Sequence, residues 1–202
     1  MYNFLISKRY KVKNNKEIYY LEKTWQKFFK KLNSKFLSIS CDNKIKNLNN
    51  FDCLIISGGG DIYDISKNNK DYMRDKFEIK LLNHFLKYNK PIIAICRGFQ
   101  LVGSFYKNKL LEINNHVRKN HKIYLYKNKY LKLKSLTTNS FHNYGFLNLN
   151  ENFKCIGKSK DNSIEIAILK QKKVLCLMFH PERKNKSQKS INKLITNFLS
   201  IN

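Results

Sequence analysis

Short apolar runs alternate with amphipathic segments through the first hundred residues of this 202-residue chain. The runs are as short as buried strands, whereas the segments between them repeat apolar residues every three or four positions, as helices do. Strands that alternate with helices pair in parallel, and the helices cover both faces of the sheet. We expect strands over residues 2–7, 35–40, 51–57 and 91–95, and helices over residues 18–32, 73–88 and 97–106.

The second half of the chain has a different pattern, in which short β-rich runs follow one another through tight turns. Neither a repeat nor a linker rich in Pro, Gly or Ser interrupts the chain, which holds only 7 Gly and 2 Pro. We therefore expect one α/β domain over residues 1–202, with a mixed, mostly parallel sheet flanked by helices. The further strands are expected over residues 122–126, 130–133, 153–157, 164–169 and 174–179, and a closing helix over residues 187–199.

The formal net charge of +26 invites a nucleic-acid interpretation. The chain holds 35 Lys but only 5 Arg, and its Lys and 27 Asn residues are spread through nearly every segment. Proteins that read bases use Arg for bidentate contacts and cluster their basic residues. The charge therefore indicates a solvated surface that can steer an anionic small substrate, and nucleic acid is not the expected partner.

Five cysteines without regular spacing favour a reducing compartment over a disulfide framework. The first apolar run is too short for a signal peptide, and none approaches the length of a membrane span. We expect a cytoplasmic protein without a membrane partner.

Cys96 stands where a buried strand runs straight into a helix, with Gly98 two residues later. A nucleophile on such a turn is held exposed, and the helix N-terminus favours its thiolate. The backbone N–H that follows can stabilise an oxyanion. A lone cysteine here would more often be a small core residue, so this interpretation depends on a partner base.

The tripeptide His180-Pro181-Glu182 supplies that base directly after an apolar strand. Pro181 keeps the segment extended, and residues two apart in extended chain point the same way. Glu182 can then orient one ring nitrogen of His180 while the other faces a nucleophile. We predict that Cys96, His180 and Glu182 form a catalytic triad.

Two segments resemble the class I glutamine amidotransferase superfamily in order and spacing. They are residues 94–100, which contain Cys96, and residues 179–182. The resemblance covers nearly the whole chain and implies a flavodoxin-like fold. Ser57 to Asp61, the group Arg74, Asp75 and Glu78, and residues 139–142 are similar to its γ-glutamyl hydrolase branch, as is Arg97 after the nucleophile.

This resemblance implies hydrolysis of a γ-glutamyl amide through a glutamyl thioester, without a cofactor. The backbone N–H groups of Gly59 and Arg97 would form the oxyanion hole. The substrate would be a small γ-glutamyl compound, and its glutamyl part would be bound by the following residues: Gly60, Gln100, Asn139, Ser140 and His142.

The compact length and the segment 115–122 are similar to one subfamily of this branch, the γ-glutamyl-CDP-amidate hydrolases of capsular phosphoramidate synthesis. Their reaction releases glutamate and cytidine diphosphoramidate. In this interpretation His116, Arg118 and His121 contact a diphosphate. A solvated loop is the competing interpretation, and a metal pair His116/His121 is weaker because no Cys or acidic ligand follows at a metal spacing. We expect no metal.

Three other functions stay open at the level of the sequence. A γ-glutamyl-γ-aminobutyrate-type hydrolase would share the branch but differ in the leaving group. A glutaminase subunit of a two-component amidotransferase would need a synthase partner, and Arg97 with residues 139–142 argues against it. A catalytically silent nucleic-acid-binding protein is supported by the charge alone. The sequence leaves the oligomeric state open.

Overall fold

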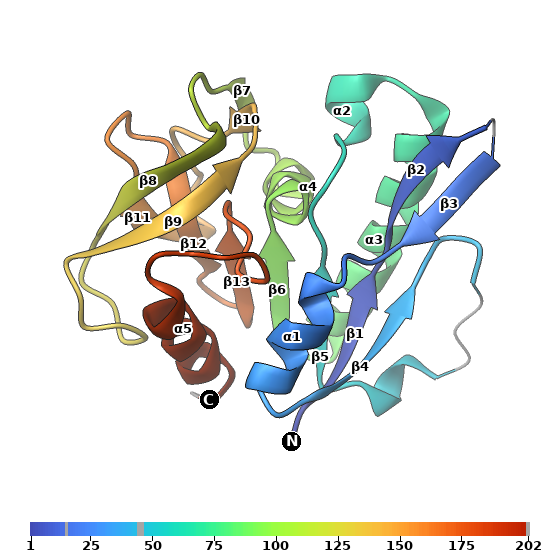
Figure 1. Cartoon of the computed structure of the whole chain (residues 1–202), viewed down its shortest axis with the longest axis horizontal. Helices are drawn as coiled ribbons and strands as arrows, with labels where there is room; N and C mark the ends of the chain where they lie inside the picture. Colours follow the sequence, from blue (N-terminus) through green and yellow to red (C-terminus); the bar gives the residue numbers. More distant parts are fainter. Residues whose placement is uncertain (15, 44–46, 201–202) are drawn as a thin grey trace.

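The computed structural model describes residues 1–14, 16–43 and 47–200. A nine-stranded sheet crosses the molecule in the order β4-β1-β5-β6-β13-β12-β11-β8-β9 (Figure 1). The strands from β4 to β13 in this order pair in parallel, and those from β13 to β9 pair antiparallel. The predicted α/β class with a mixed sheet is confirmed. The strands of this sheet are β1 (Asn3–Ser7), β4 (Lys35–Ile39), β5 (Cys53–Ile56), β6 (Ile92–Ile95), β8 (Val117–Leu125), β9 (Ser135–Phe141), β11 (Phe153–Lys158), β12 (Ile164–Leu169) and β13 (Val174–Leu177).

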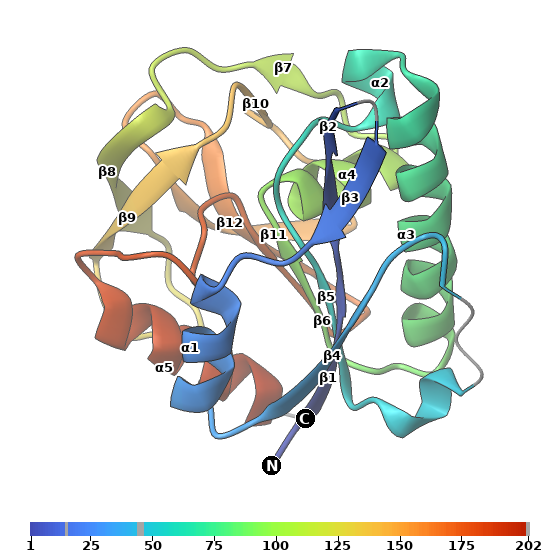
Figure 2. The same ribbon diagram turned by 45° about the vertical axis from the view of Figure 1, so that its right-hand side comes forward.

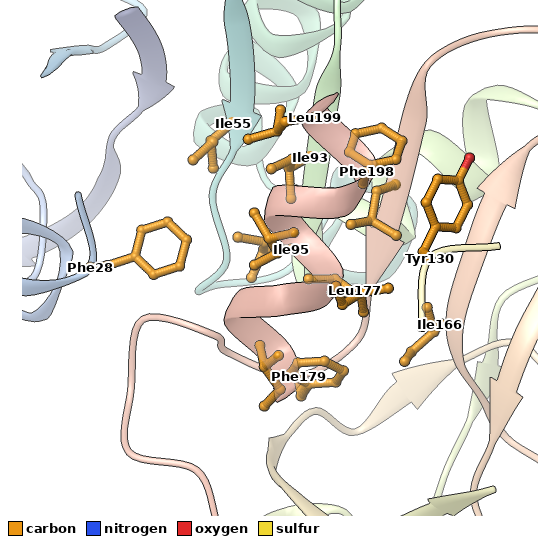
Figure 3. Packing of buried hydrophobic residues seen from close by; sticks show 14 of the residues in the cluster. Phe28, Ile55, Ile93, Ile95, Tyr130, Ile166, Leu177, Phe179, Phe198 and Leu199 are labelled. Carbon is orange, nitrogen blue, oxygen red and sulfur yellow. The ribbon is translucent and has the colours of Figure 1, made fainter. Parts of the chain in front are cut away.

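Helices cover both faces of the parallel part of the sheet (Figure 2). On one face, Ile93 and Ile95 of β6 pack in a core with α1 and α5, which Figure 3 shows around Phe179 and Phe198. On the other face, Ile92 of β6 packs with α3 and α4. Burial on both faces explains why these strands read as continuous apolar runs. The helices are α1 (Thr24–Lys31), α2 (Tyr63–Ser66), α3 (Asn69–Lys87), α4 (Arg97–Phe105) and α5 (Gln188–Ser200), with a 3₁₀ turn η1 (Leu48–Asn50).

The helix expected over residues 18–32 is wrong in its first part. Only α1 is helical there, and Ile18 lies in β3 (Lys16–Tyr20), which forms an antiparallel hairpin with β2 (Arg9–Lys13). Tyr10 and Tyr19 pack across this hairpin with their ring centroids 6.3 Å apart. Such cross-strand aromatic pairs stabilise strands, and here they outweigh the helical spacing of Ile18 and Leu21.

The strand expected over residues 130–133 is also wrong. The side chain of Asn128 accepts hydrogen bonds from the backbone N–H groups of Tyr130 and Leu131, at 2.9 and 2.8 Å. These N–H groups are therefore used in a local turn and not in a strand ladder. The apolar residues that suggested a strand are buried all the same, Tyr130 and Leu131 among them.

Most of the basic segment, for which a solvated loop was the competing interpretation, lies in β8, which begins at Val117 and not at residue 122. It pairs with β9, a strand that the sequence pattern did not indicate, and the register shifts between Val117 and Lys119. Arg118 occupies this bulge with a φ of 54°. Two short strands, β7 (Leu111–Glu112) and β10 (Tyr144–Gly145), pair beside it.

Within the described residues, no helix combines the length and the apolar character that crossing a bilayer requires. The five cysteines are all unpaired.

Candidate active site

Cys96 lies between the end of β6 and the start of α4. Its backbone has a φ of 52° and a ψ of −106°, a combination that is costly for any residue with a side chain and is typical of functional turns. Its N–H donates to Leu177 O at 2.7 Å, and its carbonyl accepts the first helical bond from Gln100 at 3.1 Å. The strained turn is thus fixed from both sides and directs the thiol to the carboxyl edge of the sheet.

His180 follows β13, the strand that pairs with β6. Its Nδ1 lies 2.7 Å from Glu182 Oε1, and its backbone N–H and C=O are both bound by the side chain of Asn139, at 2.9 and 2.8 Å. The structure therefore brings Cys96, His180 and Glu182 together as the sequence predicts.

Gly58 explains how closely the imidazole approaches the thiol. A Cβ atom added to Gly58 would lie 2.6 Å from His180 Cε1 and 3.1 Å from Cys96 Cβ. Only glycine at position 58 leaves room for the His180 ring beside the Cys96 side chain. Cys96 and His180 are accordingly 6% and 3% exposed.

Electrostatics favour the charged form of His180. Burial alone would lower its pKa, but the Glu182 carboxylate and the negative charge on Cys96 together raise the pKa of His180 to about 10. The imidazolium is therefore the form of His180 held at neutral pH.

The glycine turn after β5 lies beside this pair. Gly59 and Gly60 have φ values of 92° and 75°, and Arg74 Nη1 donates to Gly59 O at 2.6 Å. Arg97 is the first residue of α4, where a backbone N–H has no acceptor within the helix. This arrangement is compatible with the oxyanion hole that the resemblance implies for Gly59 and Arg97.

The side chain of Arg97 has a different role from its backbone. It is fully buried and forms ion pairs with Asp75 and Glu78 of α3, and its Nε donates to Asp61 O at 2.8 Å. Arg74 Nε binds Glu78 at 3.0 Å. These two arginines and two carboxylates tie α4 and the glycine turn to α3.

Two further arginines lie at the entrance to the site. Arg9 of β2 packs against Gly59, and Arg183 lies over the ring of Phe141, with 4.5 Å between Cζ and the centroid. The Phe141 ring in turn packs against His180, with 5.8 Å between the centroids. Both guanidinium groups bind Glu22, at 2.6 and 2.8 Å, and Arg183 Nε also lies 3.9 Å from Glu182 Oε1.

Sequence reasoning missed Arg9 and Arg183. The strand β2 that carries Arg9 was not predicted, and residues 18–20 of its partner β3 were expected as the start of a helix. The choice of arginine at these two positions could have identified them from the sequence. In a chain with 35 Lys and 5 Arg, each arginine is a departure from the background composition.

The residues expected to bind the glutamyl group differ in whether their polar atoms are available to a substrate. Gln100 is buried, and its Nε2 donates to Tyr144 O at 2.8 Å, which leaves its Oε1 available. Both polar atoms of Asn139 are engaged by His180, which differs from the expected contact with substrate. Ser140 is fully buried with an unpaired hydroxyl.

The residues expected to contact the leaving group also differ in whether their side chains are available. Arg118 is exposed and forms no hydrogen bond or ion pair with any residue in the described ranges. His116 is 5% exposed and is bound inside a cluster with His142 and Glu165. His121 Nε2 lies 3.4 Å from the other oxygen of Glu165.

The sequence matches the model of the Peptidase C26 family over residues 6–182. It is 31% identical over 132 residues to the γ-glutamyl-CDP-amidate hydrolase of Campylobacter jejuni, an alignment that covers 65% of this chain and 62% of that protein. It is 26% identical over 168 residues to the glutamine amidotransferase-like protein YvdE of Lactococcus lactis, with 69% and 71% covered. The chain thus spans less than two thirds of the length of the Campylobacter relative.

Solved structures show the same fold. A glutamine amidotransferase from Thermotoga maritima superposes with a TM-score of 0.76 at 14% identity, over 98% of this chain and 96% of that one. One from Methylobacillus flagellatus superposes with a TM-score of 0.67 at 12% identity, over 90% and 70%. With a family match that extends from β1 to Glu182, this chain belongs to the Peptidase C26 family.

Proposed function

We propose that this protein hydrolyses a γ-glutamyl amide, with Cys96 as nucleophile, His180 as acid and base, and Glu182 as the group that orients His180. The observation that carries the proposal is the strained turn at Cys96 facing an imidazole whose other nitrogen is 2.7 Å from a carboxylate. A structural cysteine would need neither the strain nor the paired base.

In the first half of the reaction, the Cys96 thiolate attacks the γ-carbonyl carbon of the substrate. The backbone N–H groups of Gly59 and Arg97 stabilise the oxyanion that forms. His180 donates its proton to the leaving nitrogen, the carbon–nitrogen bond breaks, and a glutamyl thioester is left on Cys96.

In the second half, neutral His180 takes a proton from water, and the hydroxide attacks the thioester. The carbon–sulfur bond breaks, glutamate leaves, and the thiolate and imidazolium are restored. Glu182 stabilises the imidazolium in the resting enzyme and in each transition state.

We infer that the entrance arginines, and not residues 139–142, bind the α-carboxylate of the glutamyl group. Arg9 Nε is buried without a hydrogen-bond partner beside Gly59, and the Arg9 and Arg183 guanidinium groups share the single carboxylate of Glu22. Gln100 Oε1 is the acceptor for the α-amino group, because Nε2 is already bound to Tyr144 O. An anion at this position lies within reach of the turn that stabilises the oxyanion.

The proposed substrate is γ-glutamyl-CDP-amidate, cleaved to glutamate and cytidine diphosphoramidate in capsular polysaccharide modification. Two observations support it, the 31% identity to the Campylobacter protein and the free guanidinium of Arg118 at the bulge of β8. Val117 pairs with Phe141, which contacts His180, so the bulge is close to the site where the leaving group departs. A diphosphate would receive charge-assisted hydrogen bonds there.

A glutamate-release assay over a panel of amides tests both levels of the proposal. The panel holds glutamine, γ-glutamyl-γ-aminobutyrate and γ-glutamyl-CDP-amidate, each with wild-type protein and with Cys96→Ala. We expect the highest kcat/KM for the nucleotide amide. Preference for γ-glutamyl-γ-aminobutyrate would replace the substrate but keep the reaction, whereas no release from any amide would overturn the reaction itself.

A further inference from the structure

Three histidines and a buried carboxylate meet at the start of β8, away from Cys96. They come from separate parts of the chain. His116 directly precedes β8 and His121 lies within it, whereas His142 follows β9 and Glu165 lies in β12. Glu165 is fully buried in an otherwise apolar run. A carboxylate in such a position is costly unless positive charge surrounds it.

The ligand atoms of this cluster have the spacing of a tetrahedral metal site. His116 Nδ1 lies 3.1 Å from His142 Nε2, and each of these atoms lies 3.4 Å from Glu165 Oε1. Zinc bonds of about 2.0–2.1 Å at tetrahedral angles place neighbouring ligand atoms about 3.3–3.4 Å apart. Two imidazoles and one carboxylate are also a set of ligands that zinc accepts, with a fourth position left open.

In the neutral form of each ring, the hydrogen-bond partner selects the nitrogen that carries the proton. His142 Nδ1 is 3.1 Å from Tyr144 O, a carbonyl that can only accept. His116 Nε2 is 2.8 Å from the carboxylate of Asp161. When both rings are neutral, each turns an unprotonated nitrogen toward the other and toward Glu165. Three acceptors that face one another repel unless a cation lies between them.

The groups around the cluster match the outer shell of a metal site. Histidine ligands usually donate their second N–H to a carboxylate or a backbone carbonyl, as His116 and His142 do here. Ser163 Oγ donates to Glu165 Oε1 at 3.2 Å, and Ser159 Oγ donates to Asp161 Oδ1. The remaining oxygen of Glu165 lies 3.4 Å from His121 Nε2, and neither atom has another polar partner among the described residues.

A cavity of about 640 Å³ opens onto this cluster and gives it access to solvent. His116, His121 and Asp161 line the cavity together with Lys122 and Lys160. An ion could enter by this route, and its fourth position could take a water molecule or His121.

We propose that His116, His142 and Glu165 bind a divalent transition-metal ion, zinc by preference, in a tetrahedral site separate from the cysteine nucleophile. The ion would link β8, β12 and the turn that follows β9, three residues from Asn139, which holds the backbone of His180. It would take no part in the proton transfers at Cys96. The proposal is independent of the proposed reaction because it is tested by binding.

The test uses the full chain with Cys96→Ala, so that the candidate nucleophile cannot bind metal. After treatment with a chelator, the protein is titrated with Zn²⁺ by calorimetry and with Co²⁺ by visible absorption. We expect one ion per chain, the strong visible bands of tetrahedral Co²⁺, and no thiolate charge-transfer band. Magnesium should not compete, because it prefers oxygen ligands in an octahedron.

Variants locate the site. Glu165→Gln and His142→Gln should weaken Zn²⁺ binding by about 100-fold or more, and Asp161→Asn, which changes only a partner of a ligand, by about 10–100-fold. His84→Ala, a histidine of α3 outside the cluster, should bind as the parent does. Because Asp161 is half-exposed, its variant should fold even if a buried change does not.

Two results would overturn the proposal. One is a parent protein that takes up no Zn²⁺, which would mean that a shared proton holds the cluster together. The other is Zn²⁺ binding that Glu165→Gln, His142→Gln and Asp161→Asn all leave unchanged, which would place the ion elsewhere.

Discussion

The parallel and antiparallel parts of the sheet contribute to the site in different ways. In the parallel part, Cys96 and His180 follow two neighbouring strands, β6 and β13, so backbone pairing alone brings them to one edge. In the antiparallel part, β8, β9 and β12 contribute side chains that meet only through cross-strand pairing, as His121 and Thr138 do. The first arrangement fixes reacting atoms, and the second shapes what surrounds them.

This difference leads to an expectation about variants. Changes in the parallel part should reduce the turnover of every γ-glutamyl amide, because the same atoms react in each case. Changes in the antiparallel part should affect one substrate or one ligand and spare the others, except at Asn139, whose side chain holds the backbone of His180.

The largest effect should come from Cys96→Ala, which removes the nucleophile. We expect kcat to fall by about 10⁴-fold or more on each substrate, as for the loss of a nucleophile in other triads. Glutamate release measures it, and Cys41→Ala, a half-buried cysteine outside the triad, should keep the wild-type rate. If Cys96→Ala kept about a tenth of the activity, the mechanism would be wrong.

Glu182→Gln should reduce kcat by about 10³–10⁴-fold, less than His180→Ala, because the base is kept and only its orientation and charge stabilisation are lost. The two variants are compared with the same assay. A Glu182→Gln enzyme as impaired as His180→Ala would mean that Glu182 does more than orient.

The pH dependence of stability offers a second measurement on the same pair. The folded pKa of His180, about 10, is above its unfolded value of 6.5. Its contribution to stability is therefore complete below pH 6.5 and is lost as the pH rises through 10. Urea unfolding of wild-type protein and Glu182→Gln should show a stability difference that shrinks over this window. A constant difference would contradict the raised pKa.

Arg97→Met should destabilise the fold by about 3–5 kcal/mol, because it leaves the buried carboxylate of Asp75 without its ion-pair partner and leaves Glu78 paired with Arg74 alone. Arg118→Met is the matched control in the antiparallel part, and with an exposed side chain it should stay within about 0.5 kcal/mol of wild type. Urea unfolding gives both values. Equal stabilities would mean that the buried network does not hold α4 to α3.

The smallest effect should be the most selective. Arg118→Ala should reduce kcat/KM for γ-glutamyl-CDP-amidate by about 10–100-fold, the value of a charge-assisted hydrogen bond, and leave glutamine unaffected. Arg183→Ala, beside Glu22 and Phe141, should impair both substrates alike. Equal losses on both substrates in Arg118→Ala would assign the bulge a general supporting role, and no loss on either would make it plain surface.

The sequence predicted that Cys96, His180 and Glu182 lie together because their signals are local. A strand that runs into a helix places Cys96, and a two-residue spacing in extended chain sets Glu182 beside His180. The parallel strands were predictable for the same reason, since burial on both faces leaves continuous apolar runs.

The surroundings were not predictable from local pattern. Arg9 reaches Gly59 from β2, a strand whose partner β3 ends in residues that also fit helical spacing. β9 contains the polar run 137–140, so no apolar pattern indicates its pairing with β8. Glu165 carried a signal that could have been used. A single acid between Ile164 and Ile166 in a buried strand requires positive partners, and the chain has only 5 His to offer beside its Lys and Arg.

The segment that follows His180 also lies along the outer edge of β9. Asn185 Oδ1 accepts from Asn139 N–H at 2.8 Å, and Ser187 exchanges hydrogen bonds with the backbone of Thr137, at 2.8 and 3.1 Å. An uncovered edge strand can template the addition of a strand from another chain. The loop that follows His180 therefore also covers the edge of β9 and keeps it from pairing with another chain. A mutation that loosened this loop would have two effects: it would displace His180, and it would make the protein prone to self-association.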